Sequence, residues 1–375
     1  MMRTRSLFVA ALVCGCGGGR TMAAPSATSP ISAPTISISA AQNGAELITL
    51  SAATAGSTIH YTIDGSSPSS SSRIYEAPVL VDTSLTVKAI AVSSGAQSRV
   101  ATRNFTMSIP SGTLVWSEEF KNVTGSREQP NPKVWTYDTG HGGFGNKELE
   151  TYCAWGSNAG PCSTANPNAY VGTDGYLHIT AKQPHRRVYT SARLKSQGLF
   201  SFQYGRLEAR MKLPEEQGLW PAFWLLGNNV TTIDWPACGE LDVMEHIDGN
   251  NPPPQVGTPV PGYDWIAGSI HGGTRRTEVS GSVKYHPSGF SAADWHTYGM
   301  IWRKGEIQYY VDNPSNVYAT FTTTNGTFNG KWPFDDGPEF ILFNLAVGGS
   351  WPGPPDSTTV FPADVLVDYV RLYTN

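Results

Sequence analysis

Short runs of β-branched and aromatic residues, each ended by Gly, Pro, Asn or Asp, recur along almost the whole chain, and none shows a convincing helical period. The last run, VLVDYVRLY, alternates apolar and polar residues clearly. Such runs predict β-strands. So many strands require packed pairs of sheets, because one open sheet would leave an apolar face in water. The predicted fold class is therefore all-β, built from sandwiches.

The length and charge of the chain limit both its architecture and its partners. The 375 residues suit two domains preceded by a targeting segment. Only 15% of the residues are charged and the net charge is −4, so we expect no nucleic-acid partner, which would attract a basic surface. No apolar run is long enough to span a bilayer.

Residues 1–24 predict a signal peptide, because two arginines precede an apolar run over residues 7–13. The residues before Cys16 are similar to a bacterial lipoprotein box, which would place a lipid on Cys16 and hold the protein at the cell surface. Cleavage near Ala23 or Ala24 is the alternative and would release an extracellular protein. Either reading predicts export.

Residues 25–35 are rich in Ala, Pro, Ser and Thr and predict a flexible linker. Residues 36–108 contain short alternating runs between turn signals, which predict a small β-sandwich. The run TIHYTIDGSSPSSSSRIYEAPVLV resembles the immunoglobulin-like module at the C-terminus of chitobiases. We expect an accessory module there and a hairpin turn at Asp64-Gly65.

A spacer role is the favoured interpretation of this module, because it has no cluster of carboxylates. Sugar binding through Tyr61 or Tyr75 is the alternative. The boundary with the next domain lies at Ser111 and Gly112, and residues 113–375 form the second domain.

Three cysteines follow the targeting segment. Cys153 and Cys162 bracket a short Gly- and Asn-rich loop, and export permits them to pair. Such a bond would stabilise the fold by roughly 2–3 kcal/mol. The sequence alone leaves the pairing open. Cys238 is predicted to be a small buried residue and not a nucleophile, because no thiol-activating His follows it.

The stretch GELDVMEHIDG at residues 239–249 carries three carboxylates on one predicted strand. Strict alternation would put Glu240 and Asp242 on one face and Glu245 on the other. One extra residue, a β-bulge, would return Glu245 to the shared face. Three carboxylates on one face repel each other, so a structural role rarely explains them. The pattern predicts a glycosidase site.

Glycoside hydrolysis uses one carboxylic acid as proton donor and a second carboxylate facing the anomeric carbon, about 5–5.5 Å apart in retaining enzymes. With one bulge, the α-carbons of Glu240 and Glu245 are roughly 13 Å apart, and two inward-leaning side chains close most of that distance. Asp242 between them would help keep Glu245 protonated, or orient Glu240 by sharing a proton. These residues alone do not decide which Glu is the nucleophile.

Residues 113–375 resemble the bacterial laminarinase branch of glycoside hydrolase family 16. The matching stretches, in order, are LVWSEEF, GGFGNKELETY, YTSARLKSQGLFSFQYGRLEARMKLP, QGLWPAFWLLG, WPACGELDVMEHI, WHTYGMIWRKGEIQYYVD, FNLAVGGSWPG and LVDYVRLY. The resemblance implies a β-jelly roll and a retaining mechanism with Glu240 as nucleophile and Glu245 as acid/base. Met244 marks the bulged form, which mixed-linkage lichenases lack.

This resemblance therefore implies endo-hydrolysis of β-1,3-glucans such as laminarin, with or without β-1,3-1,4-glucans, by a monomer. Two alternatives remain: an enzyme for another polymer, such as agarose, carrageenan or mixed-linkage glucan, and a glucan-recognition protein without catalysis. Non-catalytic relatives have lost the catalytic carboxylates, whereas Glu240 and Glu245 are both present here.

Aromatic residues near the carboxylates favour a sugar ligand, because pyranose rings stack on indoles. The expected substrate-binding tryptophans are Trp220, Trp224 and Trp235. Core packing is the alternative, and for Trp224 the two readings are equal. The resemblance adds four polar contacts: Asn146, Arg193, His271 and Asn344.

The resemblance also implies a structural Ca²⁺ away from the catalytic residues. Carbonyls of the first strand and of an early turn, at Glu119 and Gly175, would bind it together with the Asp368 carboxylate of the last strand. Oxygen ligands suit this ion. An exposed strand residue is the alternative for Asp368. No cofactor is expected for the chemistry itself.

Overall fold

The computed structural model describes residues 31–122, 124–247, 264–324, 328 and 332–375. The predicted signal peptide, Cys16 and the first part of the linker lie outside these residues. Over the described residues, β-strands are joined by loops and by four short 3-10 turns: η1 (Gln42–Gly44), η2 (Gly143–Gly145), η3 (Asn228–Thr231) and η4 (Pro333–Asp335). None of the helical segments in this part is long and apolar enough to cross a membrane.

A small sandwich of two sheets occupies the predicted accessory module. One sheet has the order β1-β2-β4 and the other joins β3, β5, β6 and β7. Their bounds are β1 (Thr35–Ala40), β2 (Glu46–Ser51), β3 (Thr58–Thr62), β4 (Val79–Val81), β5 (Leu85–Ser93), β6 (Ala96–Gln97) and β7 (Ala101–Phe105). Ile48, Val79 and Val87 are among the buried side chains of its core.

The chain turns at Asp64-Gly65, as the sequence predicts, but the hairpin is wider than a two-residue turn. The Asp64 carboxylate accepts the main-chain N–H of Ser66, and Gly65 has a positive φ of 79°. The chain then returns antiparallel beside β3, where Ile74 forms a bridge with His60. Only after this short pairing does the next strand, β4, join β2 in the other sheet.

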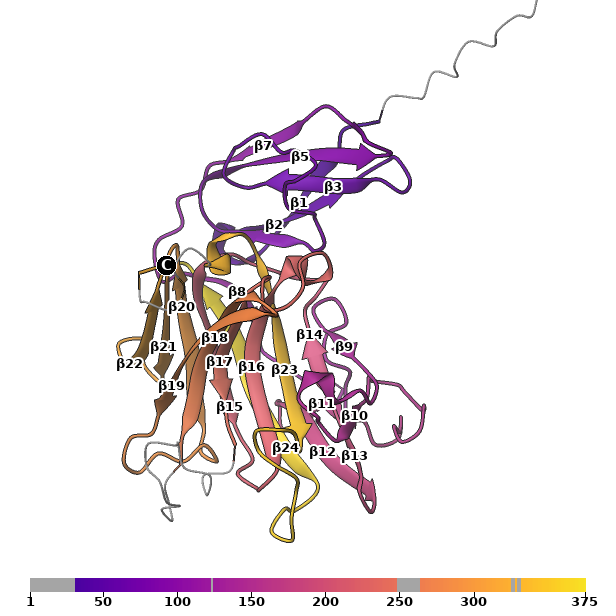
Figure 1. Ribbon diagram of the computed structural model, residues 1–375, viewed down its shortest axis with the longest axis vertical. Coiled ribbons are helices and arrows are strands. Elements are labelled where there is room, and N and C mark those ends of the chain that lie inside the picture. Colours follow the sequence, from indigo (N-terminus) through magenta and orange to yellow (C-terminus); the bar gives the residue numbers. More distant parts are fainter. Residues whose placement is uncertain (1–30, 123, 248–263, 325–327, 329–331) are drawn as a thin grey trace, which may run out of the picture. The chain divides into compact units, whose positions relative to one another are not determined.

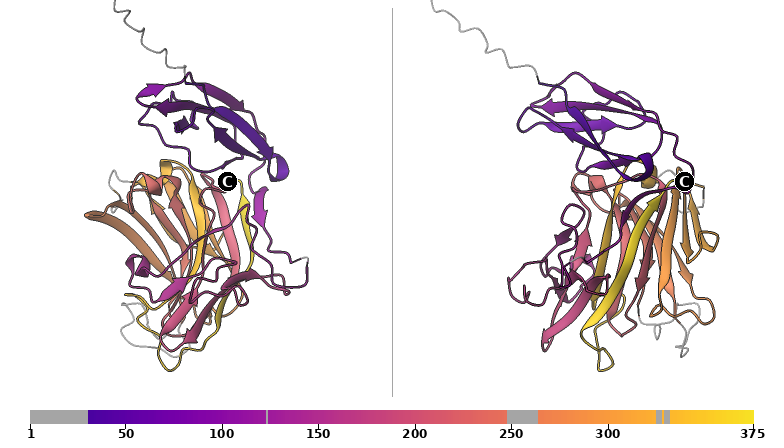
Figure 2. Two further views of the ribbon diagram at one scale, coloured as in Figure 1. Left: turned by 90° about the vertical axis from the view of Figure 1, so that its right-hand side faces the viewer. Right: turned by 180° about the vertical axis from the view of Figure 1, so that it is seen from behind.

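The second domain is a larger sandwich, the β-jelly roll that the sequence predicts (Figures 1 and 2). Its ten-stranded sheet contains β8 (Leu114–Glu118), β10 (Glu150–Tyr152), β11 (Ala169–Val171), β12 (Leu177–His185), β13 (Val188–Ser191), β15 (Gly205–Lys212), β20 (His296–Arg303), β21 (Glu306–Val311), β22 (Val317–Thr322) and β24 (Ala363–Tyr373).

The seven-stranded sheet has the order β19-β18-β17-β16-β23-β14-β9. Its strands are β9 (Thr136–Asp138), β14 (Arg193–Lys195), β16 (Leu219–Gly227), β17 (Glu240–Glu245), β18 (Ile266–Thr274), β19 (Thr277–Tyr285) and β23 (Glu339–Val347). Figure 1 shows β17 beside β16 and β18, within this sheet and not at its edge.

One apolar core separates the two large sheets. β24 alternates between buried and partly exposed residues, as its sequence predicts, and its inward side chains include Val365, Val367 and Leu372. All nine residues of β23 are buried, because one of its faces meets the opposite sheet and its other face is covered by the residues around the site. Its nearly continuous apolar sequence, EFILFNLAV, suits a strand covered on both faces.

Candidate active site

A β-bulge brings the three carboxylates of β17 to one face of the sheet. Asp242 lies opposite Trp224 of β16 and Glu245 lies opposite Ala222, so three residues of β16 face four residues of β17. Val243 and Met244 absorb the extra position, since both are buried in the core. The bulge predicted from the sequence is confirmed, and Glu240, Asp242 and Glu245 line one cavity.

This cavity, of about 650 Å³, adjoins a second one of about 870 Å³. The residues that line both are Asn146, Trp220, Trp235, Glu240 and Glu245. Glu240 and Glu245 therefore lie where one open cleft passes from the side of Trp224 and Arg193 to the side of Ser282 and Lys284. A cleft that continues past the reactive groups in both directions suits a chain better than a small molecule.

Two tryptophans hold the two glutamates through their indole N–H groups. Trp235 Nε1 donates to Glu240 Oε2 at 2.9 Å, and Trp220 Nε1 donates to Glu245 Oε1 at 3.1 Å. Both indole N–H groups therefore donate to carboxylates and not to a sugar hydroxyl. The half-buried ring faces of Trp220 and Trp235 stay in the cleft, so stacking on a sugar remains available to them.

Burial and mutual repulsion favour proton binding by the carboxylates. Burial, and then the charge of Asp242, raise the pKa of Glu245 to about 8. The same two causes raise the pKa of Glu240. Because the groups interact strongly, protons belong to the cluster and not to single residues. At neutral pH the site therefore retains the acidic proton that a glycosidase needs.

His271 of β18 supplies a positive charge beside the nucleophile candidate. Its Nε2 lies 3.3 Å from Asp242 Oδ2 and 3.9 Å from Glu240 Oε1, and its Nδ1 lies 2.8 Å from Glu278 Oε1. Burial opposes the charge, but the hydrogen bond and charge of Asp242 outweigh it and raise the pKa of His271 to about 10. The charge of the protonated ring opposes the rise in the pKa of Glu240.

Ligand atoms of Glu240, Asp242 and His271 lie within 4.8 Å of one another, as the ligands of a metal ion would. A protonated imidazole has no lone pair to give to a metal. With its raised pKa, His271 acts at neutral pH as a cation in its own right, so these three residues fit proton chemistry better than metal binding.

The remaining predicted residues form one wall of the cleft. Trp224 Nε1 donates to Asn344 Oδ1 at 2.8 Å, and the guanidinium of Arg193 lies 4.5 Å from the centre of a Trp224 ring. Trp224 is only 8% exposed, which leaves little of its ring for a sugar to stack on. Asn146 lies on the same cavity, next to the 3-10 turn η2. The structure thus brings all seven predicted substrate-binding residues to the cleft.

Sequence reasoning missed several residues of the cleft. Trp351 is 37% exposed and meets Trp220 edge-on, with 5.2 Å between the ring centres. It lies in the turn SWPG, and a Trp between turn residues is a signal that could have identified it. Lys284 of β19 also lines the cleft, and its Nζ lies 3.7 Å from a ring centre of Trp265; no sequence pattern predicts this contact.

Two of the residues predicted to bind calcium pair with arginines. Arg371 donates two hydrogen bonds to the Glu119 carboxylate, which leaves the main-chain carbonyl of Glu119, the predicted ligand, uninvolved in that pair. Arg210 Nη1 donates to Asp368 Oδ2 at 2.7 Å, so a guanidinium competes with the ion for this carboxylate. The calcium site stays a prediction.

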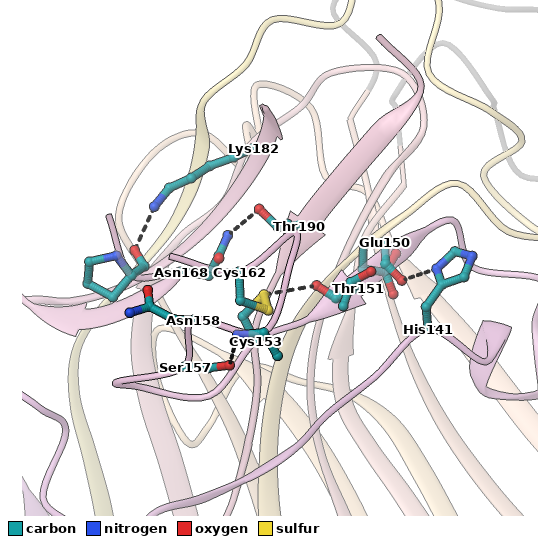
Figure 3. The surroundings of a disulfide bond; sticks show 12 residues. His141, Glu150, Thr151, Cys153, Ser157, Asn158, Cys162, Asn168, Lys182 and Thr190 are labelled. Carbon is teal, nitrogen blue, oxygen red and sulfur yellow. Dashed lines mark hydrogen bonds between the residues drawn. A yellow bond between two sulfur atoms is a disulfide. The ribbon is translucent and has the colours of Figure 1, made fainter. Parts of the chain in front are cut away.

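Cys153 and Cys162 form a disulfide that closes the loop after β10 (Figure 3). The residue before Cys153 is the last of β10, and the Cys153 N–H donates to the Ser191 carbonyl of β13. Cys238 is 2% exposed, and burial raises the pKa of its thiol to about 12. The prediction that it is a small buried residue beside the site strand is confirmed.

Each of the two domains matches a known protein family. The family model for glycosyl hydrolases family 16 matches residues 157–371, and the Fn3 associated model matches residues 48–105. A beta-glucanase of Rhodothermus marinus is 37% identical over 274 residues, which cover 70% of this chain and 86% of that protein. Glucan endo-1,3-beta-glucosidase A1 of Niallia circulans is 33% identical over 285 residues, which cover 69% of this chain and 37% of that protein.

Among solved structures, the laminarinase catalytic domain of Thermotoga maritima matches with a TM-score of 0.57 and 34% identity, over 71% of this chain and 99% of that domain. The Fn3 associated match falls within the small sandwich and agrees with the immunoglobulin-like module that the sequence predicts. The fold, the bulged carboxylate strand and these matches agree: the chain belongs to glycosyl hydrolase family 16.

Proposed function

We propose that this protein is a retaining endo-β-1,3-glucanase that cleaves laminarin-type glucans by double displacement. One observation carries the proposal: the bulge of β17 turns Glu240 and Glu245 toward the same open cleft, and burial raises the pKa of Glu245 to about 8. A carboxylic acid and a carboxylate on one face, both in contact with a cleft, are what the reaction requires.

In the first step, Glu240 attacks the anomeric carbon while Glu245 gives its proton to the departing glycosidic oxygen. The bond between sugar and leaving group breaks, and a glycosyl ester forms on Glu240. In the second step, ionised Glu245 removes a proton from water, which attacks the ester and releases Glu240. Trp220, through its hydrogen bond, keeps the Glu245 carboxyl in place during both steps.

Asp242 and His271 adjust the charge on Glu240. Asp242 is 4% exposed and lies between the two glutamates on the shared face of β17. Its charge is the second cause, after burial, that raises the pKa of Glu240. Protonated His271, held by Glu278, compensates for the negative charge of the pair. No metal takes part in these steps.

The substrate assignment is supported by the cleft and by the names of two relatives, a glucan endo-1,3-beta-glucosidase and a laminarinase. The cleft extends to both sides of the carboxylates, which favours cleavage within a chain. Trp220, Trp235 and Trp351 present ring faces or edges along it. Both catalytic carboxylates are present, which argues against a protein that only recognises glucan.

Product analysis on laminarin, curdlan and lichenan tests this proposal. We expect oligosaccharides of mixed length from laminarin, with the β-configuration in the first product observed by NMR. Glu240→Gln and Glu245→Gln should each lower kcat by at least about 100-fold, whereas Glu306→Gln on β21, away from the cleft, should be fully active. An α-configured first product, or full activity of either cleft variant, would remove the mechanism.

We also propose that the protein is exported, as a monomer, with or without a lipid on Cys16. The pattern of residues 1–24 supports export, and so does the Cys153–Cys162 disulfide, because such bonds persist in oxidising compartments. Fractionation of cells that express the wild type and Cys16→Ser separates the two routes. A lipid anchor predicts membrane attachment of the wild type alone, and retention of both in the cytosol would contradict export.

A further inference from the structure

Two buried glutamates beside the cleft have no part in the mechanism above. Glu148 and Glu150 are 6% and 0% exposed; Glu150 is the first residue of β10, and Glu148 lies two residues before it. Their carboxyl groups are close enough that the charge of Glu148 raises the pKa of Glu150. A buried carboxylate is unfavourable unless hydrogen bonds or a proton compensate for it. The contacts of Glu148 and Glu150 show which of the two carboxyl groups is compensated by hydrogen bonds and which by a proton.

Glu148 is an acceptor for groups that reach the substrate cleft. Its Oε1 accepts from Asn146 Nδ2 at 3.1 Å, and its Oε2 accepts from the Tyr152 hydroxyl at 2.8 Å. The Tyr152 oxygen in turn accepts from Asn344 Nδ2 at 3.3 Å. One carboxylate therefore fixes the amides of both Asn146 and Asn344, two residues that line the cavity beside the catalytic pair.

Glu150, in contrast to Glu148, has a hydrogen-bond donor on only one of its two oxygens. Its Oε2 accepts the main-chain N–H of Val347 at 2.6 Å, while its Oε1 is buried and has no hydrogen-bond partner. Burial, and then the charge of Glu148, raise the pKa of Glu150 to about 9. Glu150 is consequently protonated at neutral pH, and an O–H at Oε1 needs an acceptor.

We propose that Glu150 carries a proton which it donates from Oε1 to Glu148, and that this carboxyl pair holds Asn146 and Asn344 in position to bind the glucan. Glu150 is thus a positioning residue that touches no substrate. The proposal gives the unpartnered Oε1 its acceptor and gives Glu148 a third donor. It rests on the proposed function, because Asn146 and Asn344 have to contact the sugar.

Loss of the Glu150 proton would place two carboxylates together in a buried site. The other charged and titratable groups around the pair are Tyr152, Arg193 and His141, and they do not replace the proton. The charge of Arg193 opposes the rise in the pKa of Tyr152, but its guanidinium already pairs with Asp138, with 3.0 Å between Nε and Oδ2. His141 Nδ1 meets the main-chain oxygen of Glu150 at 2.9 Å, not its carboxyl group (Figure 3). Repulsion would move Glu148 and release both asparagines.

The test measures glucan binding without turnover. In a Glu245→Gln background, which removes the titration of the acid/base, laminarihexaose binding is followed by calorimetry at about pH 7 and about pH 10, on either side of the Glu150 pKa. We expect Kd to rise about tenfold over this interval, because hydrogen bonds to the sugar are lost. Adding Glu150→Gln should remove most of the rise, since an amide donates to Glu148 and accepts from Val347 at every pH; the part that remains is what His271, with its pKa of about 10, contributes.

A second variant tests the acceptor. Glu148→Gln in the same background should bind about tenfold more weakly at both pH values, with an unfolding temperature close to that of its parent. A Kd that responds equally to pH with and without Glu150→Gln, or is unchanged by Glu148→Gln, would overturn the inference while leaving the proposed function intact. Failure of the parent to bind any β-1,3-glucan would overturn the proposed function, and this inference with it.

Discussion

At the scale of single residues, the site depends on how burial sets the charge of each carboxyl group. Glu245 and Glu240 are both pushed toward the protonated form by burial and by Asp242, and His271 opposes this with a positive charge. The sequence predicted the three acidic residues and the help that Asp242 gives to Glu245. It did not predict that Glu278 would hold His271, because the two residues meet only through the pairing of β18 with β19.

The pKa of Glu245 predicts an alkaline limit for catalysis. The proton that Glu245 donates is lost as pH rises through about 8, so kcat/KM on laminarin should fall about tenfold per pH unit above that value. A pH profile measures this directly. An aryl glucoside with a strongly activated leaving group needs no proton from Glu245. The rate of its first step should therefore not fall at alkaline pH. A flat profile for laminarin up to about pH 10 would contradict the role of Glu245.

At the scale of elements, β17 shows what alternation can and cannot reveal. The pattern of apolar and acidic residues predicted the bulge, because Glu245 otherwise faces the core. Asp64-Gly65 shows that a turn signal does not give the length of the connection, since the chain pairs with β3 again only around Ile74 before β4 joins the other sheet. Glu148 and Glu150 were missed because β10 has only three residues and shows little periodicity, and because the partner of Glu150 is Val347, which is distant in sequence.

Removal of the bulge tests whether activity depends only on which face of the sheet Glu245 occupies. Without Val243, the run ELDME alternates regularly and keeps all three carboxylates on one face. We expect this deletion variant to remain an active glycosidase, less stable by roughly 1–3 kcal/mol because a buried valine is lost. Insertion of one Ala after Val243 also restores regular alternation, but it moves Glu245 about 7 Å farther from Glu240 along the strand, so this variant should be inactive. A folded deletion variant without activity would show that the bulge does more than orient Glu245.

The disulfide should contribute to stability and not to chemistry. Replacing Cys153 and Cys162 by Ser should lower the free energy of unfolding by roughly 2–3 kcal/mol, because the loop between them is no longer closed. Denaturant unfolding of the double variant and of Ser163→Ala, an exposed control directly after the loop, measures the difference. Equal midpoints would contradict the role of the bond, and kcat below the transition should be unchanged.

At the scale of the whole molecule, the two sandwiches differ in what they offer a polysaccharide. The small sandwich contains three aromatic residues, Tyr61, Tyr75 and Phe105, and none of them is exposed. Tyr61 is 3% exposed, which argues against the alternative in which it binds sugar. The cleft of the jelly roll, in contrast, contains several indole rings. The favoured spacer role therefore agrees with the burial of these residues.

Binding to insoluble glucan should accordingly depend on the cleft. Trp220→Ala in the full chain removes a ring face beside Glu245, so we expect retention on curdlan particles to fall at least about tenfold. Tyr75→Phe removes only a hydroxyl from the small sandwich and should bind as the wild type does. Pull-down at several particle concentrations gives both affinities. Undiminished retention of the Trp220 variant would mean that the small sandwich binds glucan itself.

The identity of the nucleophile is the claim on which the whole account depends. A β-1,3-linked 2-deoxy-2-fluoro disaccharide with an activated leaving group forms the glycosyl ester rapidly and hydrolyses it slowly, so the label stays on the enzyme. Mass spectrometry of proteolytic peptides then locates it. We expect one disaccharide per chain, attached to Glu240. A label on any other residue, or hydrolysis of the substrate with inversion and no label, would contradict it.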